Sequence, residues 1–225
     1  MQNEDEAFAD WSYVIANRAA SDEARACSLN NRADIFARRH LHQEAIRDRS
    51  EVLALQKTSP DRRYIALIRR SQSYRELGRI DEALRDLTDI LDVEDIAPQQ
   101  KSEARLRRGV LYRDLGRMTE ACEDLETVCS AGDLFPGALA SCLVEMGELA
   151  RLTGDLAAAR QYLDVATASD DAEEETIVEA LIVWARVLAD QGAPVDSERM
   201  WQSVLANPRA TAHQRSIAEN AVHVK

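Results

Sequence analysis

One stretch of the chain returns at a fixed offset of 38 residues. Residues 74–87 read YRELGRIDEALRDL and residues 112–125 read YRDLGRMTEACEDL. Weaker copies follow, and the turn position of each copy is a glycine at even spacing: Gly78, Gly116, Gly154 and Gly192. A fixed period in this range predicts stacked supersecondary units that share one continuous core.

Apolar spacing within each period predicts two helices joined by the glycine turn. Pro60, Pro98 and Pro136 recur at the same offset and suit the first turn of a helix, where no amide hydrogen is missed. We therefore predict one array over residues 1–225. Its expected parts are a half repeat at 3–16, repeats at about 22–56, 60–93, 98–130, 136–168 and 172–206, and a terminal helix at 210–223.

Each helix pair resembles a tetratricopeptide (TPR) repeat. In the copy at 98–130, Gly109 and Tyr112 match the family's small residue and aromatic, and Ala121 and Leu125 match the alanine and large apolar residue of the second helix. The usual repeat has about 34 residues, so we expect a longer first helix here. The resemblance covers nearly the whole chain. It implies an all-α fold, a right-handed solenoid of antiparallel helix pairs.

A charged pattern runs beside the apolar one. Three arginines each precede an aspartate by 16 residues: Arg32 and Asp48, Arg70 and Asp86, Arg108 and Asp124. In the fourth copy both positions change together, to Met146 and Tyr162. Joint loss is expected of a buried ion pair, because an orphan buried charge is costly. We predict that each arginine bonds the aspartate of its own hairpin. Asp10 stands in the aspartate slot of the half repeat, where we expect it to be solvated.

Composition limits the class of partner. The formal net charge of -12 disfavours nucleic acid and anionic membrane as partners. No apolar run is long enough to span a membrane, and the acidic N-terminus lacks the features of a signal peptide. The four cysteines contain no CxxC spacing, so we expect reduced, mostly buried thiols in a cytoplasmic protein. They are Cys27, Cys122, Cys129 and Cys142.

No pattern typical of catalysis is present. The sequence lacks a glycine-rich phosphate loop, a nucleophile elbow and an HExxH motif, so we predict neither enzymatic activity nor a cofactor. His40 and His42 invite a metal interpretation, but no third ligand lies nearby in sequence. His40 instead replaces the turn glycine, and histidine tolerates positive φ better than most residues. We expect no metal site.

The resemblance implies that the first helices of successive repeats line a concave groove. Three arginines at groove positions would form one stripe, with two more a turn away: Arg75, Arg113, Arg151, Arg69 and Arg107. Four aliphatic residues would form a parallel stripe: Ile68, Leu106, Val144 and Ile182. Other positions that map to the groove are Asn30, Asp34, Gln72, Val110, Glu148 and Arg186.

Two interpretations of this groove remain open. Arginines beside aliphatics would suit a peptide or helix that carries acidic and apolar residues, because forked arginine–carboxylate bonds set register and apolar contacts supply affinity. Alternatively, Glu76, Asp114 and Asp190 lie next to the stripe and could neutralise it.

Three functions follow from these patterns. The leading hypothesis is a noncatalytic protein-interaction scaffold that binds a peptide or helix in the groove. The second is homo-oligomerisation through the unpaired terminal half-repeats, which carry Phe8, Trp11, Ile217 and Val222, because end repeats normally need a polar cap. The third is a regulatory TPR fragment of a larger enzyme or transcription regulator.

Overall fold

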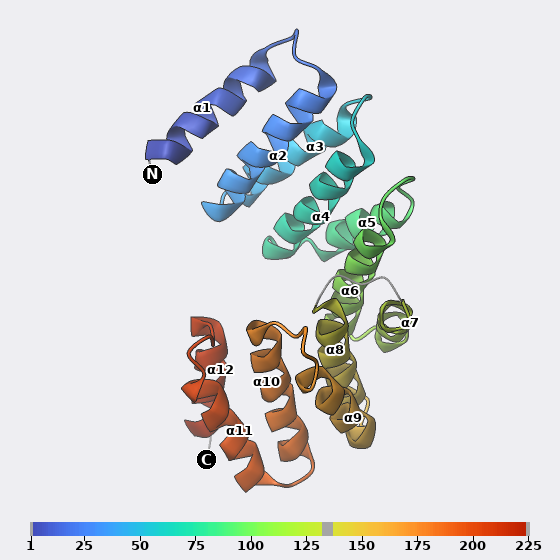
Figure 1. Cartoon of the computed structure of the whole chain (residues 1–225), viewed down its shortest axis with the longest axis vertical. Helices are drawn as coiled ribbons and strands as arrows, with labels where there is room; N and C mark the ends of the chain where they lie inside the picture. The colour runs from blue at the N-terminus through green and yellow to red at the C-terminus, as the bar shows by residue number, and fades with distance from the viewer. Residues whose placement is uncertain (1, 132–136, 224–225) are drawn as a thin grey trace. The chain divides into compact units, whose positions relative to one another are not determined.

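The computed structural model describes residues 2–131 and 137–223, and within these ranges it contains twelve α-helices and no strand (Figure 1). The chain divides into two compact units, Met1–Arg108 and Gly109–Lys225. None of the described helices is long and apolar enough to cross a membrane.

The first unit holds five complete helices and most of a sixth. They are α1 (Gln2–Ala16), α2 (Asp22–Arg38), α3 (His42–Ala54), α4 (Pro60–Glu76), α5 (Ile80–Leu91) and α6 (Pro98–Asp114). Helices α1 to α4 lie side by side in Figure 1, each packed on its chain neighbour, and α2 also packs on α4. Ser21 and Ser59 cap α2 and α4 through their side-chain oxygens.

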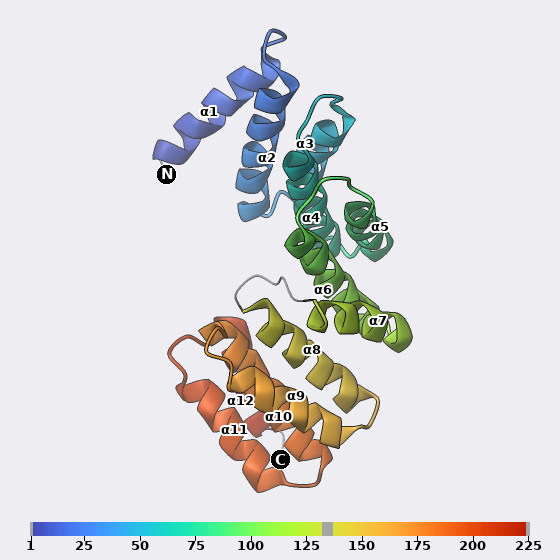
Figure 2. The ribbon, with the colours of Figure 1, turned by 45° about the vertical axis from the view of Figure 1, so that its right-hand side comes forward.

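The second unit holds the end of α6 and six further helices, most of which are visible in Figure 2. They are α7 (Met118–Cys129), α8 (Ala138–Leu152), α9 (Leu156–Thr167), α10 (Glu174–Asp190), α11 (Pro194–Ala206) and α12 (Ala212–His223). The helix start expected at Pro136 lies outside the described residues. Buried aliphatic residues of α8, α9 and α10 form one core cluster, and residues of α10, α11 and α12 form the next.

The turns within helix pairs require a left-handed backbone. The four repeated glycines have φ between 70° and 87°, a region that glycine enters without steric cost. His40 takes the same position with φ 58°. The expectation that His40 replaces a turn glycine is confirmed.

Close approach inside a helix pair depends on a small residue facing a large one. A Cβ on Gly109 would lie 3.0 Å from Cγ of Leu125, and one on Gly147 would lie 3.0 Å from Cγ of Leu163. In both pairs the large residue follows the small one by 16 positions and is fully buried. A methyl group at either glycine would therefore crowd the facing leucine.

The predicted ion pairs form in the two hairpins of the first unit that contain them. Arg32 reaches both carboxylate oxygens of Asp48, at 2.7 and 2.8 Å. Arg70 reaches both oxygens of Asp86, at 2.8 and 2.6 Å. Both aspartates are buried. Arg108 and Asp124 belong to different units, and their pairing stays a prediction.

A hydroxyl group from the preceding second helix completes each arginine's bonding. The arginine Nη1 atoms lie 2.8 to 3.3 Å from these oxygens, in the pairs Arg32 with Ser12, Arg70 with Ser50 and Arg108 with Thr88. The three hydroxyl residues are themselves 38 apart. Each arginine thus links its own hairpin to the preceding helix. Asp10, which takes the aspartate position in the leading half repeat, is exposed.

One expectation about the cysteines is wrong. Cys129 at the end of α7 and Cys142 on α8 form a disulfide, whereas Cys27 and Cys122 are free. The two half-cystines are 13 residues apart and belong to successive helix pairs, a contact that sequence spacing did not indicate. The expected cytoplasmic location rested in part on four reduced cysteines, and the disulfide removes that support.

We expect Arg70→Met to lower the free energy of unfolding by about 3 kcal/mol, because it leaves the buried carboxylate of Asp86 unpaired. The double variant Arg70→Met, Asp86→Tyr copies the residues of the fourth repeat and should be more stable than the single variant. Urea unfolding measures both, with Arg85→Met, at an exposed position of α5, as control. A double variant that is less stable than the single one would contradict the pairing.

We expect alkylation of the unfolded, unreduced chain to modify two of its four cysteines, because the other two are joined. Reduction should then lower the free energy of unfolding by about 3 kcal/mol, as expected for release of a short closed loop. Mass spectrometry and urea unfolding measure the two effects. Four modified cysteines without reductant would show that the disulfide is absent.

Candidate functional site

The expected aliphatic stripe lies mainly inside the protein. Ile68, Val144 and Ile182 are at most 6% exposed and belong to the core. Leu106 and Val110 are half-buried. These residues therefore contribute to packing between helices, and little of their surface is open to a partner.

The arginine stripe has a different character at each position. In the first unit, Arg69 and Gln72 are exposed, and Arg107 bonds Glu103 of its own helix at 2.7 Å. Arg75 is half exposed and lies 3.8 Å from Glu76. The guanidinium group of Arg69 makes no hydrogen bond or ion pair within the described part of the first unit, although its carbonyl oxygen accepts from Arg49 and Ser73.

Arg113, in the second unit, is shared by two carboxylates. Its Nε and Nη2 donate to Oδ1 of Asp114 at 3.1 and 2.8 Å, and its Nη1 donates to Glu145. Only 17% of its side chain is exposed. Each of its three guanidinium nitrogens thus donates to a carboxylate of the chain itself.

Arg151 is likewise occupied. It donates to both carboxylate oxygens of Glu148, at 2.8 and 2.9 Å, and its Nη1 donates to Asp190 at 2.7 Å. Glu148 also accepts from Arg186 at 3.1 Å. Two of the three stripe arginines are therefore neutralised by neighbouring carboxylates, in agreement with the second interpretation of the groove. These hydrogen bonds raise the pKa of Arg151.

First helices of the second unit enclose a hollow of about 210 Å³. Side chains of α6, α8, α10 and α12 line it, so four successive first helices contribute to one surface. The lining residues are Arg113, Val144, Glu145, Glu148, Glu179, Ile182, Val183, Arg186, His213, Gln214 and Ile217.

Two carboxyl groups in this hollow hold their protons unusually well. Burial raises the pKa of Glu145 to about 7, and the charges of Glu179, Asp114 and Glu148 act in the same direction against Arg113. Burial also raises the pKa of Glu179, with a further contribution from Glu175. Burial, more than neighbouring charge, thus favours the protonated form of both carboxyl groups.

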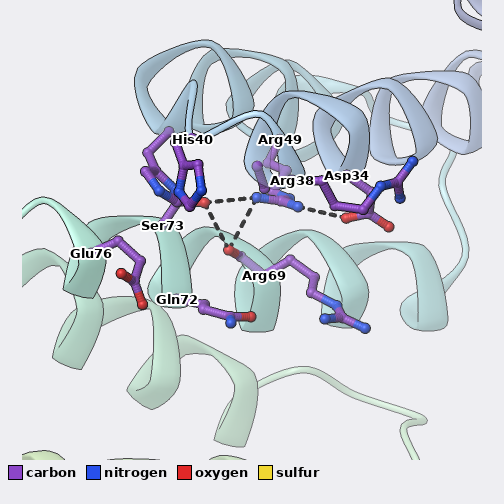
Figure 3. Close-up of a pocket in the computed structure, with 10 residues that line it drawn as sticks. Asp34, Arg38, His40, Arg49, Arg69, Gln72, Ser73 and Glu76 are labelled. Atoms are coloured by element: carbon purple, nitrogen blue, oxygen red, sulfur yellow. Dashed lines mark hydrogen bonds and ion pairs between the residues drawn. The ribbon is translucent and has the colours of Figure 1, made fainter. Parts of the chain in front are cut away.

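A larger cavity of about 450 Å³ lies in the first unit, and Figure 3 shows its lining. Its inner wall is Arg49, which is 1% exposed. Arg49 donates to Asp34 at 2.6 Å, to Oγ of Ser73 at 2.9 Å and to the carbonyl oxygen of Arg69 at 3.1 Å. Burial lowers its pKa. Arg49 was not among the predicted site residues, although it stands where later repeats have the apolar residues Leu87, Leu125, Leu163 and Trp201.

Histidine and cysteine side chains do not assemble a metal site in the part of the chain that the structure describes. No group of three His, Cys, Asp or Glu residues there could hold a metal ion. His40 and His42 have ring centroids 6.0 Å apart and stack edge to face.

Comparisons with known proteins place the fold. Residues 102–131 match the model of the tetratricopeptide repeat. A comparison with curated proteins finds no significant match.

Solved structures share the fold at low identity. A chain of the APC/C hetero-tetramer Cut9–Hcn1 is 14% identical with a TM-score of 0.66; the alignment covers 88% of this chain and 36% of that one, so the chain spans about a third of that protein. BtubC (BKLC) from P. vanneervenii is 16% identical with a TM-score of 0.69 and 94% of both chains covered. A tetratricopeptide repeat protein from Parabacteroides merdae is 16% identical, with a TM-score of 0.53 and coverage of 97% and 90%.

We expect the stability of the protein to fall as pH rises from about 4.5 to about 7, in part through Glu145. In this window the folded chain keeps a proton on Glu145 that the unfolded chain has lost, so the free energy of unfolding declines as pH rises. Glu145→Gln should reduce this decline, and Glu123→Gln, at an exposed position of α7, should leave it unchanged. Urea unfolding at pH 5 and pH 8 measures the effect, and an equal decline in wild type and Glu145→Gln would refute it.

Proposed function

Because the chain is a tetratricopeptide-repeat protein, we propose that it is a noncatalytic protein-interaction module whose inner face binds a peptide or helix of a partner. The observation that supports this most directly is the hollow of the second unit, to which α6, α8, α10 and α12 all contribute. A segment lying across the first helices would contact several repeats at once. The small contribution of each repeat would then sum to the free energy of binding.

Charge at the hollow favours a basic rather than an acidic segment there. Three guanidinium groups, of Arg113, Arg151 and Arg186, face five carboxylates in the same network: Asp114, Glu145, Glu148, Glu179 and Asp190. Three positive and five negative charges leave a net charge of -2 when every group is ionised, and -1 when Glu145, whose pKa is about 7, is protonated. Glu179 lies at the solvent surface, and its carboxylate has no hydrogen-bond or ion-pair partner among the described residues. Partial desolvation beside the hollow is what raises its pKa.

Apolar walls complete the proposed contact surface. Val183 and Ile217 lie beside the carboxylates, and Ile217 is half-buried. A partner segment with a lysine or arginine between aliphatic residues would place its charge at Glu145 and Glu179 and its apolar groups on these walls. The acidic partner expected from the stripe suits this unit less well, because Arg113 and Arg151 are each already paired with two carboxylates of the chain itself.

Self-assembly through the chain ends receives less support. Phe8 of α1 packs edge to face on Phe36, with ring centroids 5.4 Å apart, and Trp11 is half-buried. At the other end α12 packs on α11 and α10, and Trp201 is 7% exposed. Much of the apolar face of each terminal half repeat is therefore buried against helices of its own unit.

We expect Glu179→Arg to reduce capture of the partner from a lysate of the source organism by at least about tenfold, because it replaces an attractive charge by a repulsive one. Asp164→Arg makes the same charge change at an exposed position of α9, which does not line the hollow, and should leave capture intact. Circular dichroism should show equal helicity in both variants.

Equal loss of the captured protein in both variants would mean that net charge alone governs binding. Equal retention in both would place the contact elsewhere on the chain. Either result would overturn the hollow as the binding surface.

A further inference from the structure

Helix α1 stands in the register of a second helix. Its Ser12 accepts from Arg32, as Ser50 of α3 accepts from Arg70 one repeat later. A second helix in this array has two neighbours, the first helix of its own pair and the first helix of the next pair. Helix α3 accordingly packs on both α2 and α4, whereas α1 packs on α2 and turns its other side outward (Figure 1).

The outward side of α1 is exposed at positions that the neighbouring repeats bury. We call it the open face of α1, and its residues are Ala7, Asp10, Trp11 and Val14. The residues 38 places later on α3 are at most 5% exposed: Ala45, Asp48, Arg49 and Val52. Their counterparts on α5 are at most 3% exposed: Ala83, Asp86, Leu87 and Ile90. On α1, by contrast, Asp10 is exposed and the other three are half-buried.

The neighbouring repeats also show which side chains cover such a face. In each, the aspartate accepts two hydrogen bonds from an arginine of the first helix. A small buried residue follows that arginine, and an aromatic ring stands four places after it, with its centroid 5.9 or 5.7 Å from the guanidinium carbon. These residues are Arg32, Ala33 and Phe36 on α2, and Arg70, Ser71 and Tyr74 on α4.

We propose that the open face of α1 docks a helix of a partner protein, which presents an arginine to Asp10 and an adjacent small residue to Trp11. Asp10 makes no hydrogen bond or ion pair among the described residues, so both of its carboxylate oxygens are free to accept a forked pair of bonds. Glu6, one turn earlier on α1, is exposed as well. A basic helix therefore complements the charge of this face.

A second copy of the chain suits this face less well. In a head-to-tail arrangement α12, which stands in the register of a first helix, would cover α1 of the next copy. Helix α12 has Val222 at the arginine position and His223 at the small position. Docking α12 would bury the carboxylate of Asp10 without an arginine and would place an imidazole against Trp11, and both are unfavourable.

The test uses the full chain and a fluorescent peptide with the sequence of α4, residues 60–76, stapled so that it is helical in isolation. We expect saturable binding by fluorescence anisotropy. The peptide variant Arg70→Met should bind at least about tenfold more weakly, because docking then leaves the carboxylate of Asp10 without its partner. Asp10→Asn in the chain should weaken binding of the unchanged peptide in the same way.

Charge reversal tests the contact itself. Asp10→Arg should weaken binding of the unchanged peptide more than Asp10→Asn does, and the peptide variant Arg70→Asp should bind the Asp10→Arg chain at least about tenfold more tightly than it binds the wild-type chain. Asp81→Asn is the matched control, because Asp81 is exposed on α5 and lies away from α1 in the repeat. It should leave the affinity unchanged.

NMR signals of the three indole groups locate the bound peptide. Binding should shift the signal of Trp11 and leave those of Trp184 and Trp201, in the second unit, unchanged. The proposal is overturned by an absence of saturable binding, by equal weakening with Asp10→Asn and Asp81→Asn, or by shifts at Trp184 or Trp201 in place of Trp11.

Sedimentation velocity of the chain without peptide tests the source of the helix. We expect no concentration-dependent association through α1. Association that Asp10→Arg removes would overturn a partner protein as the source and assign the open face to a second copy. The open face belongs to the first unit and the hollow to the second, so this proposal goes beyond the proposed function and either can fail alone.

Discussion

The structure depends on a small residue facing a large one across each helix pair, 16 positions apart. Gly147 and Leu163 bring two helices so close that a Cβ on the glycine would lie 3.0 Å from Cγ of the leucine. A single pair buries its apolar face only on one side, so it must stack on the next pair to complete a core. Burial of Leu87, Leu125 and Leu163 to 1% exposure or less is the result.

Charged groups act as links between these apolar layers. Arg70 holds Asp86 of its own hairpin and Ser50 of the helix before it, so one guanidinium group joins three helices. Such a link is specific because each donor has one acceptor in place. The fourth copy drops the arginine and the aspartate together and replaces them by apolar Met146 and by Tyr162. A layer can therefore be joined by charge or by packing, and the repeat uses both.

The fold could be predicted from the sequence because the same pattern of packing residues recurs in successive repeats. The stacked helix pairs, the left-handed turn at His40 and two of the ion pairs followed from the repeat spacing, and the TPR-like solenoid followed from the family resemblance. The disulfide between Cys129 and Cys142 did not, since it joins successive helix pairs whose relative placement no motif encodes. Ser12, Ser50 and Thr88 recur at the repeat spacing, so their shared contact with the arginines could also have been predicted from the sequence.

Prediction of the site was less complete, because exposure and pairing are properties of the folded chain. Arg113 and Arg151 occupy groove positions in the sequence, yet their donors are directed to Glu145, Glu148 and Asp190. Arg49 lies at a position where the other copies have leucine or tryptophan, and only the folded chain shows that it is buried beside a cavity.

Photo-crosslinking tests the central claim, that the inner face of the second unit receives a partner, most directly. A photoreactive amino acid would replace either His213, which is exposed beside the hollow, or Asp164 on α9, before incubation with the captured partner. If the partner binds the hollow, a crosslinked product forms from position 213 and none forms from position 164. A product from position 164 alone would contradict binding at the hollow.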